Sequence, residues 1–266
     1  MLNLLHTLKK YQNYYFNFFK TLYVNFKLIK FRDAIYLPLV IYGKCDLKLS
    51  RSKIILNCKP RFGLIKWGLN QDLFVPSSSP SLLMMINATL YINGYIRFSP
   101  GYVLRMSGGI AYLGKNIEFG GGGKLLINSK LSIGDDCRFA FNNIICDTNY
   151  HYIVHDNKVY NNNGEIKIGK SVWVGNNCSI VKGSIIPDYS IVGAKSYVNK
   201  DFSKGGTGLL LIGNPAMIKN FGFRQIRSPK IERNIREYFI QSPQESIYNI
   251  TNEEIYYEEK LDTYFV

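Results

Sequence analysis

The chain has 266 residues, of which 46% are hydrophobic and 20% charged, so it is long enough and apolar enough to bury a substantial core. Its formal net charge is +14. This composition excludes a chain that is disordered as a whole. No segment holds the roughly 20 apolar residues that cross a bilayer, and the N-terminus lacks a signal peptide's apolar stretch and cleavage site. We therefore expect a protein that is neither secreted nor integral to a membrane.

The positive charge is concentrated at the N-terminal end. Residues 1–66 carry 13 Lys and Arg against 2 Asp, which is +11 of the total. Many aromatic residues lie in the same region, and we expect an amphipathic helix within residues 1–32 that caps the fold or contacts an anionic membrane face. An anionic glycan is another possible partner, and the lysines alternatively only keep an aromatic surface soluble. Nucleic acid is not expected, because the sequence has no zinc finger, RRM-type aromatic box or basic helix with heptads.

The five cysteines show neither a paired nor a metal-ligand spacing. We interpret them as reduced thiols of a cytoplasmic protein, in peripheral contact with the inner face of the membrane if the basic N-terminus binds there.

An aliphatic residue returns at every sixth position in the second half of the chain, at Ile168, Val174, Ile180, Ile186, Val192 and Val198. Neither the helix period of about 3.6 residues nor the strand period of 2 explains this spacing. It predicts short strands joined by tight turns, three of which close a triangular coil of about 18 residues with the aliphatic side chains inside. Gly169, Gly175 and Gly193 follow three of the aliphatic residues, and glycine suits a recurring bend because it tolerates backbone angles that a side chain forbids.

A weaker form of this phase continues upstream, at Leu113, Phe119, Leu125 and Leu131 and, after a two-residue slip, at Ile133, Phe139 and Ile145. We therefore expect an all-β solenoid domain over residues 85–220. Residues 1–84 then form an N-terminal basic segment with a helix and leading strands. Residues 221–266 form a C-terminal helix, from Arg224 to about Phe239, and an acidic tail.

The repeat is interrupted over residues 146–164, and a loop on a rigid solenoid is a natural place for a functional site. His151 and His155 both lie in this loop. An imidazole takes a proton from an alcohol or amine as that group attacks a carbonyl, if a partner such as Asp147, Asp156 or a backbone carbonyl fixes its tautomer. A metal site is not expected, because the loop is not helical in pattern and lacks a third ligand. Alternatively, both histidines only belong to a hydrogen-bonded loop.

Four motifs occur together in the second half of the chain: Asp147-Thr148-Asn149-Tyr150-His151, Ile168-Gly169-Lys170-Ser171-Val172-Trp173-Val174-Gly175, Val192-Gly193-Ala194-Lys195-Ser196 with Lys200-Asp201, and Gly213-Asn214-Pro215-Ala216. In combination they resemble the hexapeptide-repeat acyltransferases, and most of all bacterial O-acetyltransferases that modify surface polysaccharides such as capsules. The resemblance covers about residues 130–220, with a looser likeness from about 20 to 130. It implies a left-handed parallel β-helix, usually in a homotrimer.

The resemblance also implies a mechanism. His151 matches the general base, which deprotonates an acceptor hydroxyl for direct attack on the thioester of acetyl-CoA, with no metal and no covalent enzyme intermediate. Asn149 stands where many relatives carry an acid, so Asp147 is the nearest candidate to orient His151. Tyr150, Tyr152 and Asn149 are candidates to bind a saccharide acceptor.

The CoA positions follow from the same resemblance, which places CoA in a groove between two neighbouring subunits. Trp173 is expected to project into this groove near the active centre. The matching candidates for CoA binding are Gly175, Asn176, Ala194 and Lys195 along the pantetheine arm, and Asn199, Lys200 and Lys219 near the nucleotide end. Met217 stands where the family often has a cation, so the phosphate contacts are less well defined than the thioester end.

Two alternatives to O-acetylation remain open. The acceptor could be an amino sugar, which would give N-acetylation. The protein could be a non-catalytic β-helix scaffold, in which case His151 is dispensable. A zinc hydratase on the same solenoid, similar to carbonic anhydrase, is not expected, because the third histidine, His6, is remote from the loop.

Overall fold

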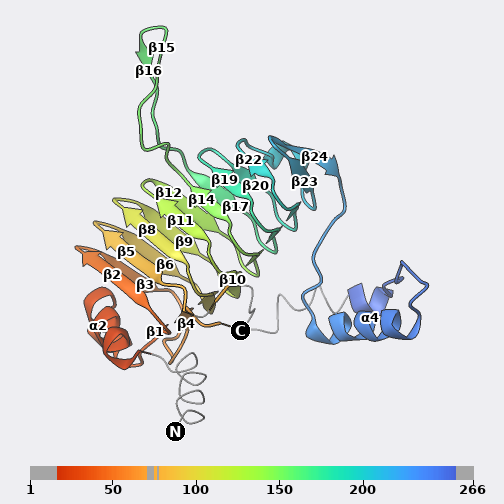
Figure 1. Cartoon of the computed structure of the whole chain (residues 1–266), viewed down its shortest axis with the longest axis horizontal. Coiled ribbons are helices and arrows are strands. Elements are labelled where there is room, and N and C mark those ends of the chain that lie inside the picture. Colours follow the sequence, from red (N-terminus) through yellow and green to blue (C-terminus); the bar gives the residue numbers. More distant parts are fainter. Residues whose placement is uncertain (1–16, 71–74, 77, 256–266) are drawn as a thin grey trace. The chain divides into compact units, whose positions relative to one another are not determined.

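The computed structural model describes residues 17–70, 75–76 and 78–255, and the chain divides into two units, Met1–Arg224 and Gln225–Val266. In the first unit the chain winds into a left-handed parallel β-helix whose coils stack one on the next (Figure 1). Each coil contributes one strand to each of three sheets, and neighbouring strands in these sheets pair in parallel until the last pair. The predicted fold class is therefore confirmed.

A coil passes in turn through three sheets, sheet 1, sheet 2 and sheet 3. Sheet 1 contains β1 (Leu39–Ile41), β4 (Ile65–Trp67), β7 (Ile96–Phe98), β10 (Ile117–Phe119), β13 (Arg138–Phe139), β18 (Trp173–Val174), β21 (Ile191–Val192), β23 (Leu210–Gly213) and β24 (Ala216–Asn220). Sheet 2 contains β2 (Cys45–Ser50), β5 (Ser81–Ile86), β8 (Val103–Ser107), β11 (Lys124–Ile127), β14 (Ile144–Cys146), β19 (Ser179–Val181) and β22 (Tyr197–Val198). Sheet 3 contains β3 (Lys53–Leu56), β6 (Thr89–Ile92), β9 (Ile110–Leu113), β12 (Lys130–Ile133), β17 (Ile166–Ile168) and β20 (Ile185–Ile186).

The coils begin with β1, 46 residues before the expected start near residue 85 (85 − 39), which falls in β5 of the second coil. The early coils escape the six-residue pattern because they are longer. Val174 pairs with Val192, which lies 18 residues later in the chain (192 − 174), whereas Trp67 pairs with Phe98, which lies 31 residues later (98 − 67). Longer strands and turns shift the aliphatic positions out of phase, so a fixed-period search does not register them.

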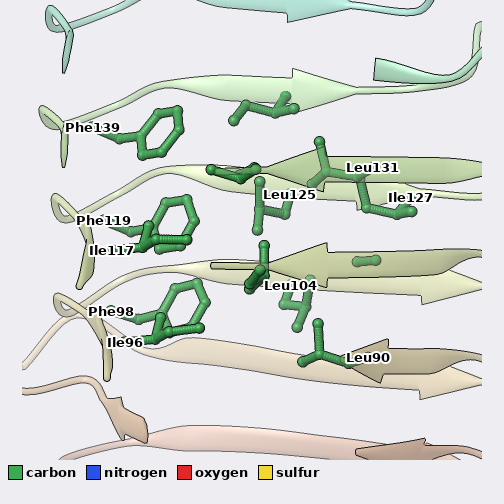
Figure 2. Packing of buried hydrophobic residues seen from close by; sticks show 14 of the residues in the cluster. Leu90, Ile96, Phe98, Leu104, Ile117, Phe119, Leu125, Ile127, Leu131 and Phe139 are labelled. Carbon is green, nitrogen blue, oxygen red and sulfur yellow. The ribbon is translucent and has the colours of Figure 1, made fainter. Parts of the chain in front are cut away.

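The core is a set of columns of side chains that run from coil to coil. In sheet 1 the rings of Phe98, Phe119 and Phe139 stack with centroid distances of 4.6 and 4.8 Å, and this column is visible in Figure 2. These distances match the spacing of neighbouring strands, so each ring sits directly over its equivalent. Val174 and Val192 continue the same register in the later coils.

The two-residue slip in the sequence lies within β12. Leu131 and Ile133 both face the core, since alternate residues of a strand share a face. They pair with Ile166 and Ile168 in the next coil, so the slip moves the phase from one inward position of the strand to the other.

Glycines at the corners serve close packing, and this corrects the expectation that they supply unusual backbone angles. A Cβ on Gly134 would lie 2.6 Å from the Lys170 nitrogen of the next coil, and one on Gly175 would lie 2.8 Å from the Ala194 nitrogen. The positive φ angles fall two residues later instead, for example at Asp136 (58°). The glycines are therefore needed because neighbouring coils approach closely there.

The N-terminal end of the β-helix is covered by α2 (Phe18–Leu28), which is followed by the short α3 (Phe31–Ala34). The Asn25 side chain accepts a hydrogen bond from the Leu39 nitrogen at 3.0 Å, and the Thr21 hydroxyl accepts one from the Ile41 nitrogen at 3.1 Å. The helix thus satisfies backbone groups of β1, which would otherwise form an open sheet edge. The predicted amphipathic cap helix is confirmed at these residues.

The opposite end of the β-helix closes differently. The strands β23 and β24 pair antiparallel, with the turn at Asn214-Pro215, so the chain reverses and stops the parallel stacking. In the second unit, α4 (Pro229–Gln241) starts five residues after the expected Arg224, because Ser228 caps it and Pro229 occupies its first turn. Residues 256–266 of the expected acidic tail lie outside the described residues. Among the helices that the structure describes, none is long and apolar enough to cross a membrane.

Candidate active site

The loop that interrupts the repeat leaves sheet 2 after β14 and rejoins sheet 3 at β17. Asp147 is the first residue after β14, and it fixes the start of the loop to the body of the β-helix. Its carboxylate is fully buried and accepts hydrogen bonds from the backbone nitrogens of Asn128 and Ser129, at 2.7 and 2.8 Å, in the preceding coil. The Gly164 nitrogen donates to the Asp147 carbonyl at 2.9 Å, so the two ends of the loop are tied together.

The next residues form a tight turn that ends at His151. The Asn149 nitrogen donates to the Asn162 carbonyl at 2.9 Å, which extends the pairing of the two ends of the loop. The His151 nitrogen then donates back to the Asn149 carbonyl at 2.7 Å, and Tyr150 between them has a φ of 60°. An i to i+2 hydrogen bond around a positive φ is a rare and strained γ-turn. It leaves the His151 side chain exposed at the base of the projecting loop.

Arg105 holds the residue before the histidine. Its guanidinium lies 4.9 Å from the centre of the Tyr150 ring, a cation–π distance. Burial raises the pKa of the Tyr150 hydroxyl, although the charge of Arg105 acts in the opposite direction. Arg105 reaches this position because β8, β11 and β14 are adjacent in sheet 2 and share one register, in which Arg105 and Cys146 both pair with Leu126.

Sequence reasoning did not find Arg105. It lies 46 residues before His151 in the chain (151 − 105), and nothing around it resembles a motif. The register of the coils was the only signal for it. That register needs the positions of β8, β11 and β14, which the weak upstream repeat did not define.

Beyond His151 the loop projects away from the β-helix as a two-stranded hairpin of β15 (Val154–His155) and β16 (Lys158–Val159), visible in Figure 1. Every residue from 151 to 161 is exposed, including Tyr152. The His155 imidazole lies at the hairpin tip, with its Nδ1 3.4 Å from the Asp156 carboxylate. His155 thus follows His151 by four residues, lies on β15, and has its own partner.

The returning arm of the loop is held by charged side chains. The Lys182 ammonium donates to the Asn161 carbonyl at 2.9 Å. Glu165, just after the loop, forms ion pairs with Lys130 at 2.9 Å and Lys167 at 3.3 Å. Partial burial disfavours the ionised form of Glu165, but the hydrogen bonds and charges of the two lysines outweigh this effect and lower its pKa.

Asp147, the candidate to orient His151, is held by the body of the β-helix. Both of its carboxylate oxygens are occupied by amides of the preceding coil. Burial raises the pKa of Asp147, while hydrogen bonds from backbone nitrogens, Asn128 and Ser129 foremost, lower it. The geometry therefore fits an anchor of the loop.

Four of the residues expected to bind CoA lie together. Gly175 and Asn176 follow β18, and Ala194 and Lys195 follow β21, so all four occupy the corner between sheets 1 and 2 in two successive coils. The Lys195 nitrogen donates to the Asn176 carbonyl at 2.9 Å, which joins the two turns directly. Trp173 precedes this corner on β18, with 44% of its surface exposed.

The other expected CoA residues lie elsewhere. Asn199 and Lys200 follow β22 at the corner between sheets 2 and 3, on the last coil, and both are exposed. The Lys200 ammonium lies 5.3 Å from the centre of the Phe202 ring. Lys219 is exposed on β24 at the edge of sheet 1. One chain thus places His151 at one corner of the triangular coil and Trp173 with its neighbours at another.

The five cysteines are free thiols. Across the part of the chain that the structure describes, no three His, Cys, Asp or Glu side chains converge as metal ligands.

No family model matches the chain. It is 29% identical over 94 residues to the Bacillus subtilis (strain 168) protein called "Putative acetyltransferase YvoF", an alignment that covers 35% of this chain and 49% of that protein. The chain thus spans about half the length of this curated relative.

Several solved structures are similar over most of the chain. The polySia specific acetyltransferase NeuO covers 78% of this chain and 95% of its own, with 20% identity and a TM-score of 0.47. The polysialic acid O-acetyltransferase OatWY covers 74% and 95%, with 21% identity and a TM-score of 0.43. A variant of AntD, an N-acyltransferase from Bacillus cereus, in complex with dTDP-4-amino-4,6-dideoxyglucose and Coenzyme A, covers 76% and 88%, with 15% identity and a TM-score of 0.42. At these levels of similarity none of the three assigns a role to a residue of this chain.

Proposed function

We propose that the chain is an acetyl-CoA-dependent O-acetyltransferase that acetylates a sugar hydroxyl of a bacterial surface polysaccharide or its precursor. The observation that carries the proposal is the placement of His151. It is exposed, and it is held at the base of a loop by the Asn149–His151 turn and by the contact between Arg105 and Tyr150. The four sequence motifs and the partial similarity to the named acetyltransferase support acyl transfer as its chemistry.

In the proposed reaction His151 acts as the general base. One ring nitrogen takes the proton of the acceptor hydroxyl while that oxygen attacks the thioester carbonyl carbon of acetyl-CoA. The carbon–sulfur bond then breaks, the CoA thiolate takes the proton back from the imidazolium, and the products are the acetyl ester and free CoA. Exposed tyrosines beside His151, Tyr150 and Tyr152, offer ring faces and hydroxyls that suit a saccharide.

The proposed active site is shared between two copies of the chain. In one copy His151 lies at the corner between sheets 2 and 3, and the residues proposed to hold pantetheine lie at the corner between sheets 1 and 2. A homotrimer that sets the first corner of one copy beside the second corner of the next would bring His151 to the thioester. Trp173 would then line the groove, and Asn199, Lys200 and Lys219 are proposed to contact the nucleotide end.

The test is the release of free CoA thiol from acetyl-CoA in the presence of oligosaccharide and amino-sugar acceptors. We expect acceptor-dependent release by the native protein and its loss in His151→Ala. His155→Ala is the matched control, because it removes the same side chain from the exposed tip of the same loop and should retain native activity. Loss in both variants, or in neither, would contradict the role of His151, and use of amino sugars alone would point to N-acetylation.

A further inference from the structure

The N-terminal cap carries an exposed aromatic surface. One side of α2 is buried against the β-helix, at Thr21, Val24, Asn25 and Leu28. The other side, with α3 and the residue that follows it, exposes the aromatic face, which we define as Phe18, Phe19, Tyr23, Phe26, Phe31 and Ile35. Phe19 and Phe31 are 81% and 75% exposed, so neither side chain is packed within the cap.

The members of the aromatic face form one connected surface. Phe19, Tyr23 and Phe26 follow one another at helical spacings of four and three residues, so they line one stripe of α2. The ring of Phe26 lies 5.8 Å from that of Phe31, which connects this stripe to α3. A contiguous exposed apolar patch of this kind marks an interaction surface.

Positive charge borders this surface. Residues 17–36 contain four cations, Lys20, Lys27, Lys30 and Arg32, and one acid, Asp33, which gives a net of +3 (4 − 1). Asp33 lies 3.6 Å from Arg32, while Lys27 and Lys30 are exposed at the end of α2 and the start of α3. Aromatic side chains with lysines beside them complement the headgroup region of an anionic bilayer, where rings enter the interface and ammonium groups meet phosphates.

The helix that bears the aromatic face is held rigidly. Its Asn25 and Thr21 side chains are hydrogen-bonded to β1, and the Lys20 ammonium donates to the Cys45 carbonyl at 2.5 Å. Docking therefore needs no ordering of this helix, so little of the binding free energy is lost to conformational entropy.

We propose that the aromatic face docks the protein peripherally on an anionic lipid bilayer. The charge complementarity favours lipid over a second copy of the chain, since pairing two copies through this face would bring like charges together. The rings supply the apolar contact and Lys27 and Lys30 supply the preference for anionic lipid.

The test is flotation of the full chain with two kinds of vesicle, one of phosphatidylcholine alone and one of equal parts phosphatidylcholine and phosphatidylglycerol. Binding to the anionic vesicles that weakens with added salt is expected. Each cation near an anionic leaflet contributes a factor of about five in partitioning, so Lys27→Gln/Lys30→Gln should lower it about 25-fold. The matched control is Lys124→Gln/Lys204→Gln, which removes two exposed cations of the β-helix and should float like the native protein.

The contribution of the aromatic rings to membrane binding is tested by Phe19→Ser/Phe31→Ser. This variant keeps every charge and should abolish flotation. Equal binding of the native protein to both kinds of vesicle would overturn the proposal. Unchanged flotation of Lys27→Gln/Lys30→Gln or of Phe19→Ser/Phe31→Ser would also overturn it. A fall in molar mass of Phe19→Ser/Phe31→Ser by light scattering, with flotation unchanged, would instead assign the face to contacts between copies. The thiol-release assay reads the active site independently, and all these variants are expected to retain activity there.

Discussion

Replacing Asp147 by asparagine keeps the shape of the side chain but converts one acceptor oxygen into an amino group that faces a backbone N–H. Asp147 is fully buried, and its two oxygens accept from Asn128 and Ser129 at 2.7 and 2.8 Å. A buried N–H left without an acceptor costs about 1–3 kcal/mol, and in the variant one of the two backbone nitrogens faces an amino group in place of an oxygen. We therefore expect the free energy of unfolding, measured by urea denaturation, to fall by about 2–3 kcal/mol.

Asp135→Asn is the matched control. The Asp135 carboxylate accepts a hydrogen bond from the Lys115 nitrogen at 2.9 Å at a half-buried corner elsewhere on the β-helix, so its replacement should cost about 1 kcal/mol or less. Because burial raises the pKa of Asp147, the stabilisation from this carboxyl is fully present below its unfolded pKa and is lost as pH rises through its folded pKa. The gap between native protein and Asp147→Asn should thus be wider in mildly acidic buffer than at neutral pH.

The same variant separates an anchor from a residue that orients His151. If Asp147 only anchors the loop, Asp147→Asn leaves the apparent pKa in the pH profile of kcat/KM unchanged, even where kcat/KM itself falls. A carboxylate paired with the imidazole would instead raise that pKa, and its neutralisation would lower it. An unchanged unfolding midpoint together with a lowered apparent pKa would refute the structural reasoning.

Three further predictions concern the packing of the site and the core. Arg105→Met should lower kcat about tenfold with little change in the free energy of unfolding, because Tyr150 loses its cation and His151 loses its fixed position. The control is Lys124→Met on the neighbouring strand β11, and equal kcat values for the two variants would contradict the role of Arg105. Phe119→Ala should lower the free energy of unfolding by about 3–5 kcal/mol in the same urea assay, since it empties the centre of the stacked phenylalanine column, and a loss below about 1 kcal/mol would contradict that packing. Glu165→Gln should cost about 0.5–1 kcal/mol at neutral pH by thermal unfolding. Because the pKa of Glu165 is lowered, its stabilisation is present above the ordinary pKa and lost as pH falls through the folded value, so a penalty that persists in strong acid would argue against the two ion pairs.

The sequence was sufficient for the later coils because each has the same length. Between Ile168 and Val198 the spacing is constant, so one inward position predicts the next. It was not sufficient for the first two coils, where strands such as β2 and β5 extend to six residues and the corners vary. In those coils the inward positions depend on which residues pair between strands, and this is a long-range property that a local pattern does not contain.

The candidate site, like the fold, was predictable from the sequence only in part. The break in the repeat predicted the loop and its histidines, because an insertion into a regular solenoid is visible in the sequence. The partners of Asp147 and Tyr150 were not predictable, because they belong to preceding coils: Asn128, Ser129 and Arg105. These contacts require the register of sheet 2, and that register follows from coil lengths that the weak upstream repeat left undefined.

A single-turnover experiment with acetyl-labelled acetyl-CoA tests most directly whether the acetyl group passes straight from acetyl-CoA to a sugar hydroxyl with His151 as the general base. The labelled acetyl group is followed to three places: the acceptor oligosaccharide, the protein and unreacted acetyl-CoA. We expect the label to appear on the acceptor with no labelled protein on the way, and transfer to be lost in His151→Ala but not in His155→Ala. Label that passes through the protein, or transfer at the native rate by His151→Ala, would contradict this mechanism.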